Sequence, residues 1–191
     1  MKMTRSAFAA SVTIMAIMLT GAGCGSREIH TTPVQMNPAS ESPMAYSLKD
    51  DGDNFSIRFP APAQKSVDPN LHEPEHRITY SAEGQDGLYA MDVISLDDPK
   101  TPDVLTKGAA GFQAFLMSFV YRDGTRLDST ELIQVQGSPA LQFKFVNTSG
   151  EGGTTGFITG RDENLYVVYI GTTNTPTPEG KNFFSSFAFL K

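Results

Sequence analysis

The stretch Gly137–Thr173, GSPALQFKFVNTSGEGGTTGFITGRDENLYVVYIGTT, decides the fold that this sequence predicts. Leu141, Phe143 and Phe145 alternate with smaller or polar residues, which is the period of a strand with one buried face. The segment Leu165–Ile170 is apolar at every position and too short for a stable helix, so it predicts a strand covered on both faces. We therefore expect three adjacent strands in the middle of a sheet that has something packed on each side.

The glycine-rich segment Gly150–Gly156 joins the first two of these strands. Glycine reaches positive φ at little cost, so the chain can reverse direction there. A phosphate-binding loop is the alternative, but such a loop needs the N-terminus of a helix directly after it. Phe157 and Ile158 continue a strand pattern instead, which favours a hairpin.

Two helices are predicted by a threonine followed by proline, because proline suits the first position of a helix. The first begins at Thr101-Pro102 and carries an apolar stripe at Leu105, Ala109, Phe112, Leu116 and Phe119. Gly108 and Gly111 are tolerable in it if they let the helix approach the sheet closely. The second helix begins at Thr177-Pro178 and carries aromatic residues at Phe183, Phe184 and Phe187.

Further strands alternate in the same way on the N-terminal side of these elements. They are expected at Ala45–Leu48, Phe55–Phe59, Arg77–Ala82, Leu88–Leu96 and Thr125–Gln136, and Ala63–Glu75 is expected to be a polar loop. Together the elements predict one domain over residues 45–191. Its class is α+β, an antiparallel β-sheet flanked by helices.

Composition limits the classes of function. The chain of 191 residues has 15 basic and 21 acidic residues, a formal net charge of −6, which argues against binding to nucleic acid. Its hydrophobic content of 39% suffices for one core, and its length suggests one domain. Nothing in the sequence requires a cofactor.

The N-terminus predicts export and attachment to a membrane. Lys2 and Arg5 precede the apolar run Ala7–Leu19, which has the length of a secretory signal and is too short to span a bilayer. Small residues then lead to Cys24, the only cysteine, and this pattern resembles the signal of bacterial lipoproteins, although Gly21 stands where that signal has an aliphatic residue. The resemblance implies that residues 1–23 are removed and that Cys24 is lipidated, which attaches the chain to the lipid bilayer. The alternative is a soluble secreted protein cut by the ordinary signal peptidase.

Residues 24–44 predict a disordered tether behind the lipidated cysteine, since serine, threonine, proline and asparagine dominate and no periodicity shows. In proteobacterial lipoproteins, an aspartate after the cysteine resembles a signal for retention in the inner membrane. Gly25 occupies that position here. If the host is Gram-negative, the outer membrane is therefore favoured, with the domain facing the periplasm of the cell envelope.

Four stretches together resemble the Mog1/PsbP-like group, which includes small bacterial lipoproteins. They are Phe55–Pro60 (FSIRFP), Gly137–Ala140 (GSPA), Asn164–Val168 (NLYVV) and Phe183–Phe187 (FFSSF). The resemblance covers residues 45–191 and implies an antiparallel sheet between helices, the α/β/α sandwich of that group. It also implies an accessory or binding role in a larger assembly, with no binding residue that could be carried over.

The segment His72–His76 has the letters of the H-E-x-x-H motif, in which two histidines on one helical face bind zinc and glutamate acts as the base. Pro74 stands inside the motif and opposes a helix. A surface metal site through His72 and His76 remains a weak alternative, and a solvated loop is favoured.

Two further clusters favour structural roles. Asp50, Asp51 and Asp53 do not have the spacing of a calcium loop, so they predict a turn. Four tyrosines on predicted strands are expected to be core residues, and any that are exposed would mark where a partner docks. They are Tyr80, Tyr89, Tyr166 and Tyr169.

These patterns predict a non-enzymatic lipoprotein whose domain binds or supports a protein partner in the cell envelope. No Gly-x-Ser-x-Gly elbow is present, and His30 lies in the tether, so no catalytic triad is predicted. One alternative is a small-molecule carrier, which needs a cavity between the helix at 102–119 and the sheet. The other is a hydrolase that uses His72 or His76.

Overall fold

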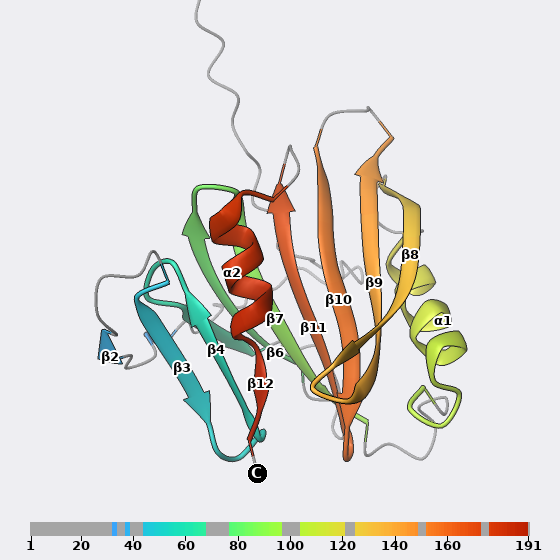
Figure 1. The fold of residues 1–191 in the computed structure, drawn as a ribbon, viewed down its shortest axis with the longest axis horizontal. Helices are drawn as coiled ribbons and strands as arrows, with labels where there is room; N and C mark the ends of the chain where they lie inside the picture. The colour runs from blue at the N-terminus through green and yellow to red at the C-terminus, as the bar shows by residue number, and fades with distance from the viewer. Residues whose placement is uncertain are drawn as a thin grey trace, which may run out of the picture.

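The computed structural model describes residues 32–33, 37–38, 44–67, 77–96, 104–120, 125–148, 152–172 and 176–190. Within these ranges, two antiparallel sheets of eight and four strands are accompanied by helices α1 (Ala109–Val120) and α2 (Pro178–Ser186) (Figure 1). In spatial order the larger sheet contains β1 (Thr32–Pro33), β5 (Gln64–Val67), β6 (Arg77–Gly84), β7 (Gly87–Ser95), β11 (Asn164–Thr172), β10 (Gly153–Arg161), β9 (Ser138–Asn147) and β8 (Thr125–Val135). The smaller sheet contains β12 (Ala188–Phe189), β4 (Phe55–Phe59), β3 (Tyr46–Asp50) and β2 (Asn37–Pro38). The predicted α+β class is confirmed.

Strand β11 lies in the larger sheet between β7 and β10. Its side chains alternate between two cores, with Tyr166, Val168 and Ile170 in one and Leu165 and Val167 in the other. All five are at most 5% exposed. The prediction of a strand covered on both faces is therefore confirmed.

The first core lies between the two sheets and is closed by α2. Phe183 of α2 packs against Phe59 of β4 and Tyr89 of β7, with ring centres 5.3 and 5.1 Å away. Phe187, which follows α2, packs against Tyr166 at 5.7 Å. Tilted and edge-to-face pairs of this kind stabilise a core beyond their buried area, so α2 holds the smaller sheet against the larger one.

The second core lies between α1 and the opposite face of the larger sheet. Phe112 and Leu116 of α1 are at most 2% exposed and belong to one cluster with Leu141, Phe143 and Ile158. These side chains pack together between α1 and the larger sheet in the described part of the chain. This is the interface where a small-molecule carrier would need its cavity.

The predicted meander of β9, β10 and β11 is present. Ile158 of β10 lies opposite Leu141 of β9 on one side and opposite Val167 of β11 on the other. The N–H of Asn147 donates to the carbonyl of Gly152 at 3.3 Å, which closes the hairpin between β9 and β10. The glycine-rich segment therefore leads from one strand into the next, as its sequence predicted.

The predicted polar loop at Ala63–Glu75 is wrong in its first part, because Gln64–Val67 form β5 and pair with β6. The sequence QKSV has a single large apolar residue, so it carries no alternation from which a strand could be predicted. The strand at the C-terminus, β12, was also missed, since two residues are too few to show a period. Among the described residues, no helix is both long enough and apolar enough to cross a bilayer.

Helix α1 begins at Ala109, later than predicted, and residues 104–108 form a turn. Gly108 has φ +55°, which a right-handed helix cannot contain. A Cβ on Gly111 would lie 2.2 Å from the carbonyl oxygen of Val104. Gly111 therefore lets the helix pack against the preceding turn. We expected a close approach of the helix to the sheet, and the contact found is with the turn instead. The expected cap, Thr101-Pro102, lies outside the described residues.

Candidate functional site

The beginning of α2 is anchored to the turn between β6 and β7 by Asp86. Its carboxylate accepts the N–H of Thr177 at 3.0 and 3.1 Å and the hydroxyl of Thr177 at 2.9 Å. A Cβ on Gly180 would lie 2.5 Å from Oδ2 of Asp86, so glycine lets the carboxylate reach the helix. The predicted start at Thr177-Pro178 is found, but the Thr177 hydroxyl donates to Asp86 and does not cap the helix.

Tyr89 strengthens this anchor from within the first core. Its hydroxyl oxygen lies 3.0 Å from a carboxylate oxygen of Asp86 and 3.0 Å from one of Glu179, which is in the first turn of α2. Burial, together with the hydrogen bonds to Glu179 and Asp86, raises the pKa of Tyr89 above its ordinary value. These contacts fix the position of α2 over the sheet and so set the geometry at its other end.

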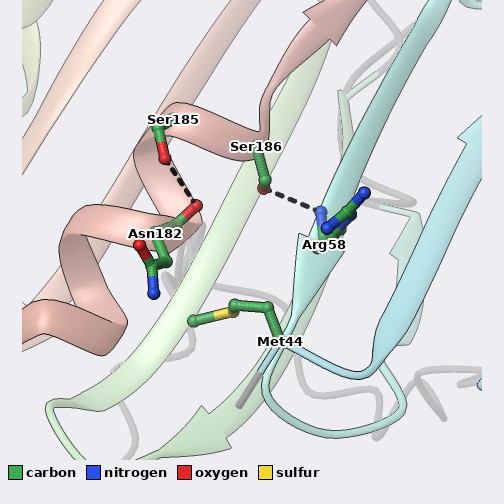
Figure 2. Close-up of a pocket in the computed structure, with 5 residues that line it drawn as sticks. All are labelled: Met44, Arg58, Asn182, Ser185 and Ser186. Atoms are coloured by element: carbon green, nitrogen blue, oxygen red, sulfur yellow. Dashed lines mark hydrogen bonds between the residues drawn. The ribbon is translucent and has the colours of Figure 1, made fainter. Parts of the chain in front are cut away.

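At the C-terminal end of α2, an open groove of about 400 Å³ lies between the helix and β4. It is lined by Met44, Arg58, Asn182, Ser185 and Ser186. Figure 2 shows Asn182 and Ser185 on the helix and Arg58 on the strand, with the Met44 side chain extending from the strand side toward Asn182. Met44 is 1% exposed and belongs to the first core, so it presents almost no surface to the groove.

The groove forms where β4 changes its partner. Strand β12 pairs Ala188 with Ser56 of β4. Further along β4, the N–H of Arg58 donates to the hydroxyl of Ser186 at 2.9 Å. The Ser186 side chain thus replaces a backbone acceptor at the point where β12 gives way to α2, and the two elements separate beyond it.

Both serines also satisfy carbonyls in the last turn of α2. The Ser186 hydroxyl donates to the carbonyl of Phe183 at 2.7 Å, and the Ser185 hydroxyl donates to the carbonyl of Asn182 at 3.1 Å. Free carbonyls at a helix C-terminus carry partial negative charge, so these bonds reduce that charge beside the groove. In the described part of the chain, neither serine is hydrogen-bonded to a histidine or carboxylate that could activate it as a nucleophile.

Arg58 and Asn182 provide the uncommitted polar groups of the groove. Three other described arginines each have a carboxylate within 4.0 Å, and they are Arg77, Arg126 and Arg161. No carboxylate of a described residue lies that close to Arg58, and the Asn182 carboxamide makes no hydrogen bond to a described residue. The groove is therefore bordered by an arginine on β4 and an asparagine on α2, and Figure 2 shows the Arg58 side chain leading away from α2.

A second polar cluster lies on the sheet between β6 and β7. Asp92 is 2% exposed and forms an ion pair with Arg77, and it also accepts the hydroxyl of Thr79 at 2.6 Å. A buried carboxylate needs such compensation to remain charged. The cluster therefore has a structural explanation: Arg77 and Thr79 provide the ion pair and the hydrogen bond that the buried carboxylate of Asp92 needs within the sheet.

Three residues singled out by the sequence, Cys24, His72 and His76, lie outside the described residues. Lipidation at Cys24 and the histidine alternatives therefore stay predictions. Among the described residues, no group of three or more histidine, cysteine, aspartate or glutamate side chains is placed to hold a metal ion.

The aspartate cluster forms the turn between β3 and β4, as predicted. Oδ1 of Asp50 accepts the N–H of Gly52 at 3.0 Å and the N–H of Asp53 at 3.2 Å. Two core tyrosines reach the same turn, because the hydroxyl of Tyr80 donates to Asp50 at 2.9 Å and that of Tyr166 donates to the carbonyl of Asp53 at 2.6 Å. The tyrosines thus belong mainly to the core, as expected: Tyr80, Tyr89 and Tyr166 are at most 1% exposed, and Tyr169 is partly buried.

The groove itself was missed by sequence reasoning. Arg58 lies within FSIRFP, and Ser185 and Ser186 lie within FFSSF, so two stretches that carried the family resemblance form its walls. The only available signal was that Arg58, Ser185 and Ser186 are polar residues within two mostly apolar stretches. That signal does not reveal that the two stretches meet.

No family model matches the sequence, and no curated protein does. The structure is similar to the solution structure of cyanobacterial PsbP (CyanoP) from Synechocystis sp. PCC 6803, with a TM-score of 0.52 over 75% of this chain and 91% of that chain, at 14% sequence identity. The fold is PsbP-like. A protein of unknown function from Pseudomonas aeruginosa matches with a TM-score of 0.36 over 75% of this chain and 83% of that chain, at 12% identity, and this match carries no argument.

At this level of identity, the PsbP-like fold establishes the architecture of the domain and leaves its function open. The described residues do, however, place a polar groove between two elements of that architecture. The groove and the N-terminal sequence are therefore the two features of the chain that bear on its function.

Proposed function

We propose that this chain is a secreted, lipid-anchored lipoprotein whose PsbP-like domain has a non-catalytic binding or accessory role in the cell envelope. The sequence around Cys24 carries this proposal. Basic residues, an apolar run of secretory length and small residues precede the only cysteine. The polar segment 25–44 follows it; Thr32–Pro33 and Asn37–Pro38 in this segment pair with β5 and β3, so they are strands and not part of the predicted disordered tether. This order is what an anchor, a tether and an outward-facing domain require.

The groove favours binding over catalysis. Its polar groups are a guanidinium, a carboxamide and two hydroxyls whose hydrogens are donated to backbone carbonyls. Such groups recognise and orient a ligand, whereas hydrolysis requires an activated nucleophile or water. The likeness to a PsbP fold is consistent with an accessory domain, and the envelope partner itself is part of the proposal.

The anchoring is tested by expressing the full chain and its Cys24→Ser variant in a bacterial host. We expect the wild-type chain in the membrane fraction, with a mature N-terminus at Cys24 that carries acyl chains in mass spectrometry. Cys24→Ser removes the sulfur that accepts the lipid, so it should leave the membrane fraction or retain its signal uncleaved. Ser26→Ala is the matched control, because it changes a neighbouring hydroxyl and should leave the membrane-bound fraction unchanged.

The opposite result is equally clear. A wild-type chain found in the soluble fraction, with an unmodified N-terminus at a position other than 24, would establish the ordinary secretory alternative and remove the anchor from the proposal.

A further inference from the structure

We propose that the free edge of β8 pairs with the same edge of a second copy of this chain, so that two larger sheets join into one across a two-fold axis. This pairing goes beyond the proposed function and depends neither on the lipid anchor nor on the groove.

Strand β8 is the one long edge of the two sheets in the described part of the chain. The other three edges are formed by β1, β2 and β12, and each of these strands has 2 residues. Strand β8 has 11 residues and pairs with β9 alone (Figure 1). An unpaired edge presents a row of backbone donors and acceptors to another strand, and proteins usually protect it by making it short, charged or bulged.

Protection of this kind is confined to the N-terminal half of β8. The register shift between Leu127 and Ser129 bulges the strand there. In the segment 129–135, Glu131 is the single charged residue and proline is absent. The side chains of residues 128–132 are all exposed, so α1 leaves this part of the edge uncovered.

Leu132 lies in the middle of the unprotected segment and is 64% exposed. Its neighbour on β9 is Leu141, which belongs to the second core. A two-fold axis through Leu132 would place the Leu132 of the second copy directly beside it. Both leucines would then be covered, and the apolar surface would continue from one second core to the other.

The turn between β8 and β9 determines which backbone groups face the free edge. Gln136 and Gly137 have φ values of 51° and 81°, as a two-residue turn of type I′ requires. The paired residues that flank this turn, Val135 and Ser138, exchange both backbone hydrogen bonds. Since the direction of these groups alternates along a strand, every second residue before Val135 faces β9 and the residues between them face away.

The residues whose backbone groups face away from β9 are therefore Thr130, Leu132 and Gln134. In the two-fold register Leu132 lies opposite Leu132, and Thr130 lies opposite Gln134 of the second copy, so these donors and acceptors satisfy one another. Glu131 lies opposite Ile133 of the second copy, so like charges do not face each other. A contact of this length is a small interface, and we expect a reversible dimer.

The test is cross-linking of the full chain in detergent micelles through introduced cysteines. In the proposed register the Cα atoms of two Leu132→Cys residues lie about 5.5 Å apart, and those of two Gln134→Cys residues lie about 14 Å apart. A bismaleimide that spans about 8 Å should therefore join Leu132→Cys chains into a dimer and leave Gln134→Cys chains as monomers. The wild-type chain, whose only cysteine is Cys24, measures any cross-linking through that residue.

Leu132→Lys tests the same edge without a cross-linker. Sedimentation velocity of the wild type should show a dimer fraction that grows with concentration. A lysine on an edge strand opposes pairing, and two would meet on the axis, so dimerisation should weaken at least about tenfold. Val67→Lys is the matched control, because Val67 is also an exposed apolar residue, 46% exposed, but lies on β5 near the opposite edge of the sheet. Far-ultraviolet circular dichroism shows that each variant is folded.

A wild-type chain that remains a monomer throughout the concentration series overturns the proposal. Equal cross-linking of Leu132→Cys and Gln134→Cys, or equal dimerisation of the wild type and Leu132→Lys, does the same. In cells, cross-linking of Leu132→Cys to a protein of another mass, without the dimer, overturns the second copy as the occupant of this edge. Membrane attachment is a separate measurement, so loss of the anchor with retained dimerisation removes only the proposed anchoring.

Discussion

Asp86 is 8% exposed, and its carboxylate accepts both the N–H and the hydroxyl of Thr177 at the start of α2. Alanine at this position would leave both donors without their acceptor and would remove a charged partner from the hydroxyl of Tyr89. Hydrogen bonds to charged groups contribute about 1.5–3 kcal/mol, and a donor left unsatisfied costs a similar amount. We therefore expect Asp86→Ala to lower the free energy of unfolding by about 2–4 kcal/mol in urea denaturation.

The control for this prediction is Asp51→Ala. The side chain of Asp51 is 77% exposed and forms an ion pair with the side chain of Lys49, which is 59% exposed. Exposed ion pairs contribute little, so the expected change is below about 1 kcal/mol. If both variants lost the same small amount, the anchor formed by Asp86 would not contribute to stability. From the sequence, Asp86 could be placed only between the predicted strands Arg77–Ala82 and Leu88–Leu96, because its partner lies 91 positions along the chain.

Among the elements, α2 contributes to the core through one face. Phe183 is fully buried and contacts Phe59 and Tyr89, whereas the next residue, Phe184, is partly exposed and contacts Phe157 with ring centres 6.0 Å apart. Replacing a buried phenylalanine by alanine costs about 3–5 kcal/mol, because it removes the apolar contact and leaves a cavity. We expect Phe183→Ala to lower the free energy of unfolding by that amount and Phe184→Ala by less than half of it, as measured by urea denaturation. Equal losses would mean that the helix is not oriented as described.

The elements that the sequence predicted well are those whose residues alternate or recur over several positions. Leu165–Ile170 and the strand that contains Phe143 could be placed because their burial is a property of the segment itself. Strand β5 and strand β12 could not, since a short polar segment or a pair of residues becomes a strand only when a partner is beside it. The start of α1 was missed because the helical pattern continues through Gly108, whose φ of +55° is set by the turn before the helix.

For the molecule as a whole, the same distinction explains why the groove was not predictable. Its two walls meet through a hydrogen bond between Arg58 and Ser186, which are 128 positions apart. Each wall alone has an ordinary pattern, an outward-facing arginine on a strand and two serines near the end of a helix. The groove forms only when the larger sheet, the smaller sheet and α2 are assembled. The periodicity of residues along the chain therefore could not predict it.

The assembled core also predicts how stability depends on pH. Burial is the first cause that raises the pKa of Tyr80, Tyr89, Tyr166 and Tyr169 above the ordinary value of about 10. Because these pKa values are raised only in the folded state, the unfolded chain loses its tyrosine protons first as the pH rises. The stabilisation is therefore complete below about pH 10 and is lost progressively as the pH rises from there through the folded-state pKa values.

We expect the free energy of unfolding, measured in urea between about pH 8 and pH 11, to fall above pH 10. The phenolate absorbance of the folded chain should rise at higher pH than that of the urea-unfolded chain. Tyr80→Phe removes the hydroxyl that donates to Asp50, so it should make the alkaline fall shallower while leaving the ring in the core. Coincident absorbance titrations of the folded and unfolded chains would show that the tyrosine hydroxyls are in water, and the core that joins the two sheets would then be wrong.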